Sequence, residues 1–112
     1  MTLRQLEMFV AIVETHGFSK AAEKLRVAQP SVSRQIRQLE EELGERLFVR
    51  LRNHKVQLTE AGEVSRKYAE KILRQEQILR MKISAMTKEP RGDIHIGICG
   101  HHLTSLLEDD SS

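Results

Sequence analysis

The feature that most constrains this chain is a long amphipathic pattern in its second half. Between Thr59 and Met86, apolar residues recur at spacings close to a heptad, with Gln75 as a polar interruption. The pattern consists of Ala61, Val64, Tyr68, Ile72, Leu79, Ile83 and Met86. Thr59 is placed to cap a helix over this stretch, which would be ~40 Å long at ~1.5 Å per residue.

Such a helix is too long to pack its whole apolar stripe on one small domain. The chain has 112 residues, which is enough for a compact domain plus an appendage but not for two large domains. A repeated stripe left in water would be a poor surface. We therefore expect a homodimer whose interface includes Val64, Tyr68, Ile72, Leu79 and Ile83.

Composition indicates a soluble, mostly helical protein. The chain is 39% hydrophobic and 30% charged, with two prolines and six glycines. Its 18 basic and 16 acidic residues give a net charge of +2, so only the placement of charges can identify a nucleic-acid binder. The single cysteine, Cys99, cannot form an internal disulfide, and the apolar run 8–13 is too short to span a membrane. With no targeting segment visible, we expect a cytoplasmic protein with no membrane partner.

The first 28 residues predict two helices. A helix over Leu3–Thr15 would begin with a capping box formed by Thr2 and Gln5. It would end at His16-Gly17, where the glycine takes the left-handed conformation. Ser19 would then cap a second, shorter helix.

A third helix is predicted to open near Pro30, which a first helical turn tolerates, and to end at Gly44. Ala28 offers no side-chain cap, which costs ~0.5–2 kcal/mol relative to serine or threonine. The apolar stripe of this helix is Val32, Ile36, Leu39 and Leu43.

The next segment predicts a two-stranded hairpin with a basic tip, which we call the wing (residues 47–58). Its strands would be 47–50 and 56–58, joined by the polar stretch 51–55. No glycine occupies the tip, so Asn53 is the residue best able to adopt a left-handed turn. The predicted fold class is therefore mainly α: a winged helix-turn-helix (three helices plus a two-stranded β wing) at 1–58, then a dimerisation helix at 59–88.

Residues 89–112 follow a different pattern. The helical period breaks at Pro90-Arg91-Gly92, and Ile94, Ile96 and Ile98 then alternate with polar residues or glycine as a strand would. A lone strand is not independently stable. We expect the helix to end here and an isolated strand to follow, with a disordered acidic-serine tail after it.

The charges of the third helix point to DNA. Two helices joined by a tight turn, with the second polar on its outer face, suit the major groove. Arginine can bind guanine with two hydrogen bonds, glutamine can bind adenine, and serine can bind a base edge or a phosphate. The acidic cluster 40–42 lies at the far end of the helix, and the wing supplies a second basic group. The polar outer face consists of Ser31, Ser33, Arg34, Gln35, Arg37 and Gln38.

The run GFSKAAEKLRVAQPSVSRQIRQLEEELGERLF (17–48) with VQLTEAG (56–62) resembles the DNA-binding domain of LysR-type transcriptional regulators. The resemblance covers 3–86, and RGDIHIG (91–97) looks like the hinge and first strand of that family's effector-binding domain. We expect the rest of that domain to be absent. It implies a transcription regulator that binds an inverted-repeat operator in double-stranded DNA. It also implies antiparallel pairing of the long helix and tetramers for full-length members. We expect no cofactor. The DNA-binding residues expected are Ser19, Gln29, Pro30, Ser31, Ser33, Arg34, Gln35, Arg37, Arg50 and Arg52.

Three alternatives remain open at this stage. The winged helix could serve protein contact instead of DNA binding, because fold does not determine function. His95, Cys99, His101 and His102 cluster within eight residues and suit zinc chemically, but their spacing matches no recognised zinc motif. An enzyme is disfavoured, because no activated nucleophile or acid–base pair stands out before Thr59.

Overall fold

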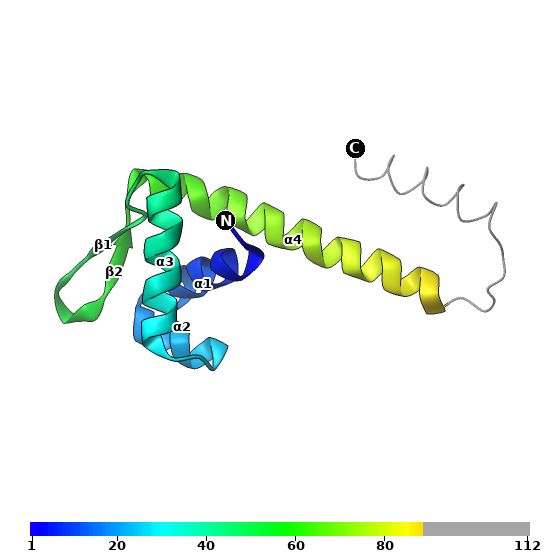
Figure 1. Ribbon diagram of the computed structural model, residues 1–112, viewed down its shortest axis with the longest axis horizontal. Helices are drawn as coiled ribbons and strands as arrows, with labels where there is room; N and C mark the ends of the chain where they lie inside the picture. The colour runs from blue at the N-terminus through cyan, green and yellow to red at the C-terminus, as the bar shows by residue number, and fades with distance from the viewer. Residues whose placement is uncertain (89–112) are drawn as a thin grey trace. The chain divides into compact units, whose positions relative to one another are not determined.

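The computed structural model describes residues 1–88. The chain divides into two compact units, Met1–Glu76 and Gln77–Ser112, and the second is described only as far as residue 88. The predicted hinge, the predicted strand at 94–98 and the acidic tail lie outside the described residues. In chain order, the elements are α1 (Leu3–Thr15), α2 (Phe18–Leu25), α3 (Gln29–Leu43), β1 (Phe48–Arg50), the 3-10 turn η1 (Arg52–His54), β2 (Val56–Leu58) and α4 (Glu60–Lys88), as Figure 1 shows.

The bounds of α1 are as predicted, but the residue that takes the left-handed conformation at its end is not. Thr2 Oγ1 accepts from the Gln5 amide and Gln5 Oε1 accepts from the Thr2 amide, each at 3.0 Å, which completes the capping box. The left-handed residue at the end of α1 is His16, with φ 65°, and not Gly17. Gly17 has an extended backbone because it is the N-cap residue of α2. The left-handed residue therefore lies one position earlier, at His16.

The expected cap of α2 by Ser19 is wrong. The helix begins at Phe18, so Ser19 lies inside its first turn and no side chain caps the helix. Ser19 Oγ instead donates a hydrogen bond of 2.9 Å to Gln29 Oε1, which connects α2 to the first residue of α3.

Helix α3 starts without a side-chain cap and ends at Gly44, which has φ 76°, both as predicted. Its predicted stripe is correct except for Leu43, which is 42% exposed. Strand β1 begins at Phe48, one residue later than predicted, and Leu47 lies just before it, fully buried in the core.

The core of the first unit lies among α1, α2 and α3 and reaches the wing through Phe48. The Phe48 ring centroid is 5.2 Å from that of Phe9 and 5.8 Å from that of Phe18. Such aromatic contacts add ~0.5–1.5 kcal/mol each beyond the area they bury. They attach β1 to α1 and α2. The largest fully buried side chains are Phe9, Ile12, Val32, Ile36, Leu39 and Leu47.

Helix α4 has a second apolar face that the heptad pattern did not predict. Ala69 is buried in the core and Leu73 packs against it, whereas Val64 and Tyr68 are exposed. Thr59 caps the helix as expected, because its Oγ1 accepts from the Gly62 amide at 3.0 Å. Among residues 1–88, no helix is long and apolar enough to cross a membrane.

Candidate nucleic-acid interface

The N-terminal half of α3 presents cations that the described protein leaves unpaired. Arg34 and Arg37 are exposed, and neither forms an ion pair with another residue of the range 1–88. By contrast, Lys24 on α2 and Arg66 on α4 pair with Glu14 and Glu63. The guanidinium groups of α3 therefore keep their donors available for an outside acceptor.

The first turn of α3 is exposed and held in place from α2. Gln29 and Pro30 are exposed, and Ser31 and Ser33 are half-buried beside Arg34. The Ser19 hydroxyl donates to the Gln29 side chain, so two predicted site residues contact each other across the helix-turn-helix. This bond orients the Gln29 amide group, whose nitrogen can still donate.

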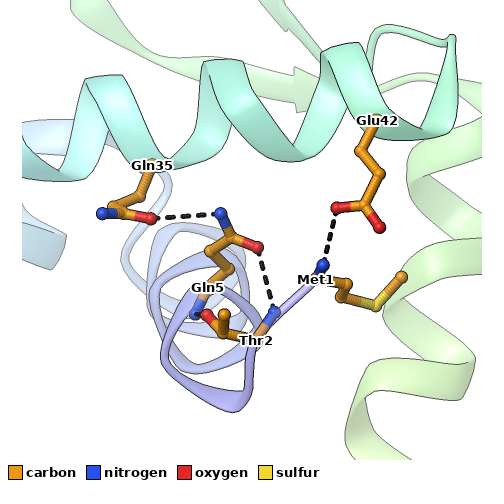
Figure 2. A network of polar contacts seen from close by, with 5 residues as sticks. All are labelled: Met1, Thr2, Gln5, Gln35 and Glu42. Carbon is orange, nitrogen blue, oxygen red and sulfur yellow. Dashed lines mark hydrogen bonds and ion pairs between the residues drawn. The ribbon is translucent and has the colours of Figure 1, made fainter.

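Gln35 differs from its neighbours because its side chain contacts α1. Its Oε1 accepts a hydrogen bond of 3.1 Å from Nε2 of the buried Gln5, as Figure 2 shows. Further along α3, Glu42 forms an ion pair of 2.6 Å with the Met1 amino group. These two contacts fix α3 against the start of α1. A direct DNA contact by Gln35 stays a prediction, whereas its bond to Gln5 gives it a positioning role.

The wing places its basic residues by two specific contacts. Strand β1 pairs antiparallel with β2, and Arg50 lies opposite Val56. The Arg50 guanidinium carbon is 4.5 Å from the centroid of the Phe18 ring, a cation–π contact that directs Arg50 toward α2. Arg52 is exposed at the start of the tip. Asn53 adopts the expected left-handed conformation with φ 68°, and His54 unexpectedly does so too, with φ 63°.

Glu40 joins α3 to the wing, a role that the sequence reasoning missed. Its Oε2 accepts from the amides of Leu47 at 2.8 Å and Phe48 at 3.4 Å, and its side chain is only 16% exposed. In the sequence it was grouped with the acidic cluster of α3. The available signal was its position one turn after the buried Ile36, on the side of the helix that faces the protein.

A cavity of about 550 Å³ lies between α3 and the wing. Ser33 and Arg37 line it from α3, and Arg50 lines it from β1. Glu41 and Glu45 also line it, so the lining of the cavity contains both basic and acidic side chains. The cavity brings the two predicted basic groups, on the helix and on the wing, to one surface.

The described residues hold no group of three or more His, Cys, Asp or Glu side chains that could bind a metal ion. The alternative metal cluster of His95, Cys99, His101 and His102 lies outside them.

Comparison with known proteins gives one consistent result. The model of the family described as bacterial regulatory helix-turn-helix protein, lysR family, matches residues 3–63. The HTH-type transcriptional regulator IlvY of Escherichia coli (strain K12) is 43% identical over 96 residues, which cover 86% of this chain and 32% of IlvY.

Solved structures agree in fold. The structure of the BenM DBD in complex with catB site 1 DNA superposes with a TM-score of 0.75 and 42% identity, covering 80% of this chain and 99% of that chain. The CbnR DBD–DNA complex superposes with a TM-score of 0.73 and 33% identity, covering 79% and 100%. The predicted fold class is thereby confirmed. The chain spans about a third of the length of the curated relatives it matches.

Proposed function

Because this chain belongs to the LysR family of bacterial helix-turn-helix regulators, we propose that it binds double-stranded DNA sequence-specifically. Helix α3 enters the major groove, and the wing lies on the backbone or in the minor groove. The observation that carries the proposal is the pair of exposed, unpaired guanidinium groups of Arg34 and Arg37 on α3. Support comes from the BenM and CbnR structures, in which chains of the same fold are described as complexes with DNA.

The roles of the site residues follow from their contacts. Arg34 and Arg37 bind bases or phosphates, and Ser31 and Ser33 serve phosphates or base edges. Gln29 and Pro30 approach the DNA at the first turn of α3, with Gln29 oriented by Ser19. On the wing, Arg50 and Arg52 neutralise backbone phosphates. Gln35 acts by positioning, since its bond to Gln5 holds α3 on α1.

We also propose that the chain forms a homodimer through α4. In the first unit, Val64, Tyr68 and Ile72 are 55%, 53% and 42% exposed. In the second unit, Leu79 and Ile83 are 60% and 45% exposed. Large apolar side chains at this exposure, repeated along one helix, are typical of an interface whose partner is a second copy. A dimer also suits an inverted-repeat operator, because the two-fold symmetries correspond.

As a whole, we propose a cytoplasmic regulator of transcription that does not act as an enzyme. The relatives that the chain matches are named as transcriptional regulators, which supports this proposal. Residues 1–58 form its DNA-binding domain and 59–88 its dimerisation helix. A full-length form with an effector domain would assemble as a tetramer.

The first test is selection of bound duplexes from a random DNA pool at physiological salt. Enrichment of an inverted repeat with half-sites one or two turns apart is the expected result. Weak, salt-sensitive binding without enrichment would contradict the proposal and favour the winged helix as a protein-interaction module.

The second test is Arg34→Ala, measured as the dissociation constant for the selected duplex. We expect a loss of ~1–3 kcal/mol, because a bidentate arginine–base contact contributes about this much. Arg66→Ala is the matched control, since it removes an arginine that is paired with Glu63 on α4. Equal effects of the two substitutions would refute the assignment of Arg34.

The dimer is tested by sedimentation of Ile72→Lys at micromolar concentrations. We expect monomers, because the lysine places a charge in the apolar interface while the exposed site tolerates it in the folded monomer. Glu70→Lys, also exposed but off the apolar stripe, should remain dimeric. An unmodified chain that sediments only as a monomer would refute the dimer.

A further inference from the structure

We propose that the cleft between the α1–α2 turn and the wing tip is a pH-dependent binding site for a phosphate group of the DNA backbone. The basic residues of its lining are His16 and Lys20 on the first side, and His54 and Lys55 on the wing. We call this site the histidine cleft. The inference rests on the proposed DNA-binding function and assigns a site to a pair of histidines that this function leaves unexplained.

The two sides of the cleft are held together by backbone contacts. The Val56 amide donates to the His16 carbonyl at 3.3 Å, across the gap between β2 and the α1–α2 turn. A Cβ atom added at Gly17 would lie 3.6 Å from the His54 carbonyl oxygen, which shows how closely the tip approaches the turn. The space between them is about 490 Å³, large enough for a phosphate and its waters.

The charge of the cleft is positive and unbalanced. His16, Lys20, His54 and Lys55 line it, with no acidic residue among its lining side chains. Neither lysine forms an ion pair with any residue in the described part of the chain. An anion is therefore the ligand that suits this cleft, and the DNA backbone supplies anions in a regular array.

Acidic residues near the cleft pair with other side chains or are not part of its lining. On α1, Glu14 pairs with Lys24. On α4, Glu63 pairs with Arg66, although it shares a neighbouring cavity with His16. Glu23, one turn beyond Lys20 on α2, does not line the cleft. Protonated histidines would therefore add to the positive charge of the two lysines rather than neutralise an acid.

The cleft adjoins the proposed DNA-reading surface. Ser19, which also lines the cleft, donates a hydrogen bond to Gln29 at the first residue of α3. A phosphate bound in the cleft would thus lie next to the start of the helix that enters the major groove. Both histidines have a left-handed backbone conformation, with φ 65° for His16 and φ 63° for His54.

The expected behaviour follows from histidine chemistry. Histidine gains a positive charge as the pH falls from 8 toward 5, while the phosphodiester stays anionic. Affinity for DNA should therefore rise as pH falls, by about tenfold between pH 8.0 and pH 5.5. The slope of log affinity against log salt should steepen by ~1–2, because each phosphate neutralised adds ~0.9 to its magnitude.

The experiment measures affinity for the selected duplex at pH 5.5–8.0 and several salt concentrations. The chain carries five histidines, so two variants separate them. In His16→Asn with His54→Asn, asparagine accepts the left-handed backbone, and the pH dependence should disappear. In the control, His95, His101 and His102 are all replaced by asparagine, and the pH dependence should remain. Thermal unfolding of each variant is recorded at both pH limits.

Two further measurements identify the ligand. Lys55→Gln should weaken binding at every pH, reduce the salt slope by ~1 and keep the pH dependence. Replacing single phosphates of the duplex by uncharged methylphosphonates should abolish the pH dependence at one position per half-site. If no single methylphosphonate abolishes the pH dependence, the contact between the cleft and one backbone phosphate is refuted. If millimolar inorganic phosphate removes the pH dependence at constant ionic strength, the cleft is a site for free phosphate instead.

The outcomes separate the two proposals. Sequence-specific binding at pH 8.0 without any rise at pH 5.5 would overturn the histidine cleft and leave the DNA-binding function standing. A pH dependence that persists in the folded double variant would also overturn it. Absence of DNA binding at every pH would overturn both.

Discussion

Replacing Glu40 by alanine should destabilise the fold and release the wing from α3. The Glu40 carboxylate accepts hydrogen bonds from two consecutive backbone amides, at 2.8 Å from Leu47 and 3.4 Å from Phe48. Both of these residues are buried, with side chains 0% and 3% exposed, so water does not readily replace the lost acceptor. A buried donor left without a partner costs ~1–3 kcal/mol. We count the 2.8 Å bond fully and the 3.4 Å bond in part, and we expect the free energy of unfolding to fall by about 2–3 kcal/mol.

The measurement is urea unfolding at one fixed protein concentration, because dimerisation makes stability depend on concentration. Glu41→Ala is the matched control, since it removes a neighbouring carboxylate from an exposed position of the same helix. It should change stability by no more than ~0.5 kcal/mol. Glu40→Gln keeps one acceptor oxygen and should lose about half as much as the alanine variant. If Glu40→Ala and Glu41→Ala unfold at the same urea concentration, the linkage of α3 to the wing by Glu40 is refuted.

The remaining predictions concern turns and helix starts, and each is measured by the same unfolding assay. Gly62→Ala should prevent stable folding or cost more than ~3 kcal/mol, because its Cβ would lie 2.2 Å from the Leu47 carbonyl oxygen; a stable variant would refute the close approach. Gly44→Ala should cost only ~1 kcal/mol, because its φ of 76° strains alanine while nothing lies within 4 Å of the added atom. Asparagine at the same position should recover part of that loss. Thr59→Ala should cost ~0.5–2 kcal/mol by removing the cap of α4, and Thr59→Ser should restore most of it.

Local chemistry explains which helix ends could be predicted. The capping box of α1 and the left-handed Gly44 depend on residues close together in sequence, and both are confirmed. The cap proposed for Ser19 is wrong because the start of α2 depends on the burial of Phe18. That aromatic side chain packs against Phe48, thirty residues away in sequence, and no local signal reports the contact.

The family and the outward face of α3 were also accessible from the sequence. The order of motifs from 3 to 86 predicted a LysR-type winged helix-turn-helix, and the fold and family are confirmed. The outward face of α3 follows from its 3.6-residue period, which places Arg34 and Arg37 away from the buried Val32 and Ile36. Their contacts with DNA remain predictions.

Tertiary structure alone decided how the elements are joined. In the sequence, Glu40 was one member of an acidic cluster, and only the structure shows that it accepts from the amides of Leu47 and Phe48. Gln35 looked like a base-reading residue, yet its carbonyl oxygen bonds to Gln5 on another helix.

Helix α4 shows most clearly which properties the sequence predicts and which depend on tertiary contacts. Its heptad pattern predicted one apolar stripe, and Val64 and Tyr68 on that stripe are exposed. Ala69, a small residue that carries little weight in a hydrophobic pattern, is the one buried against the core. Sequence periodicity therefore determined that these helices form and where their main apolar stripes lie, because those properties arise from residues three and four apart. Which apolar side packs on the domain, and which acids and amides connect the helices to the wing, was decided by contacts between residues far apart in the chain.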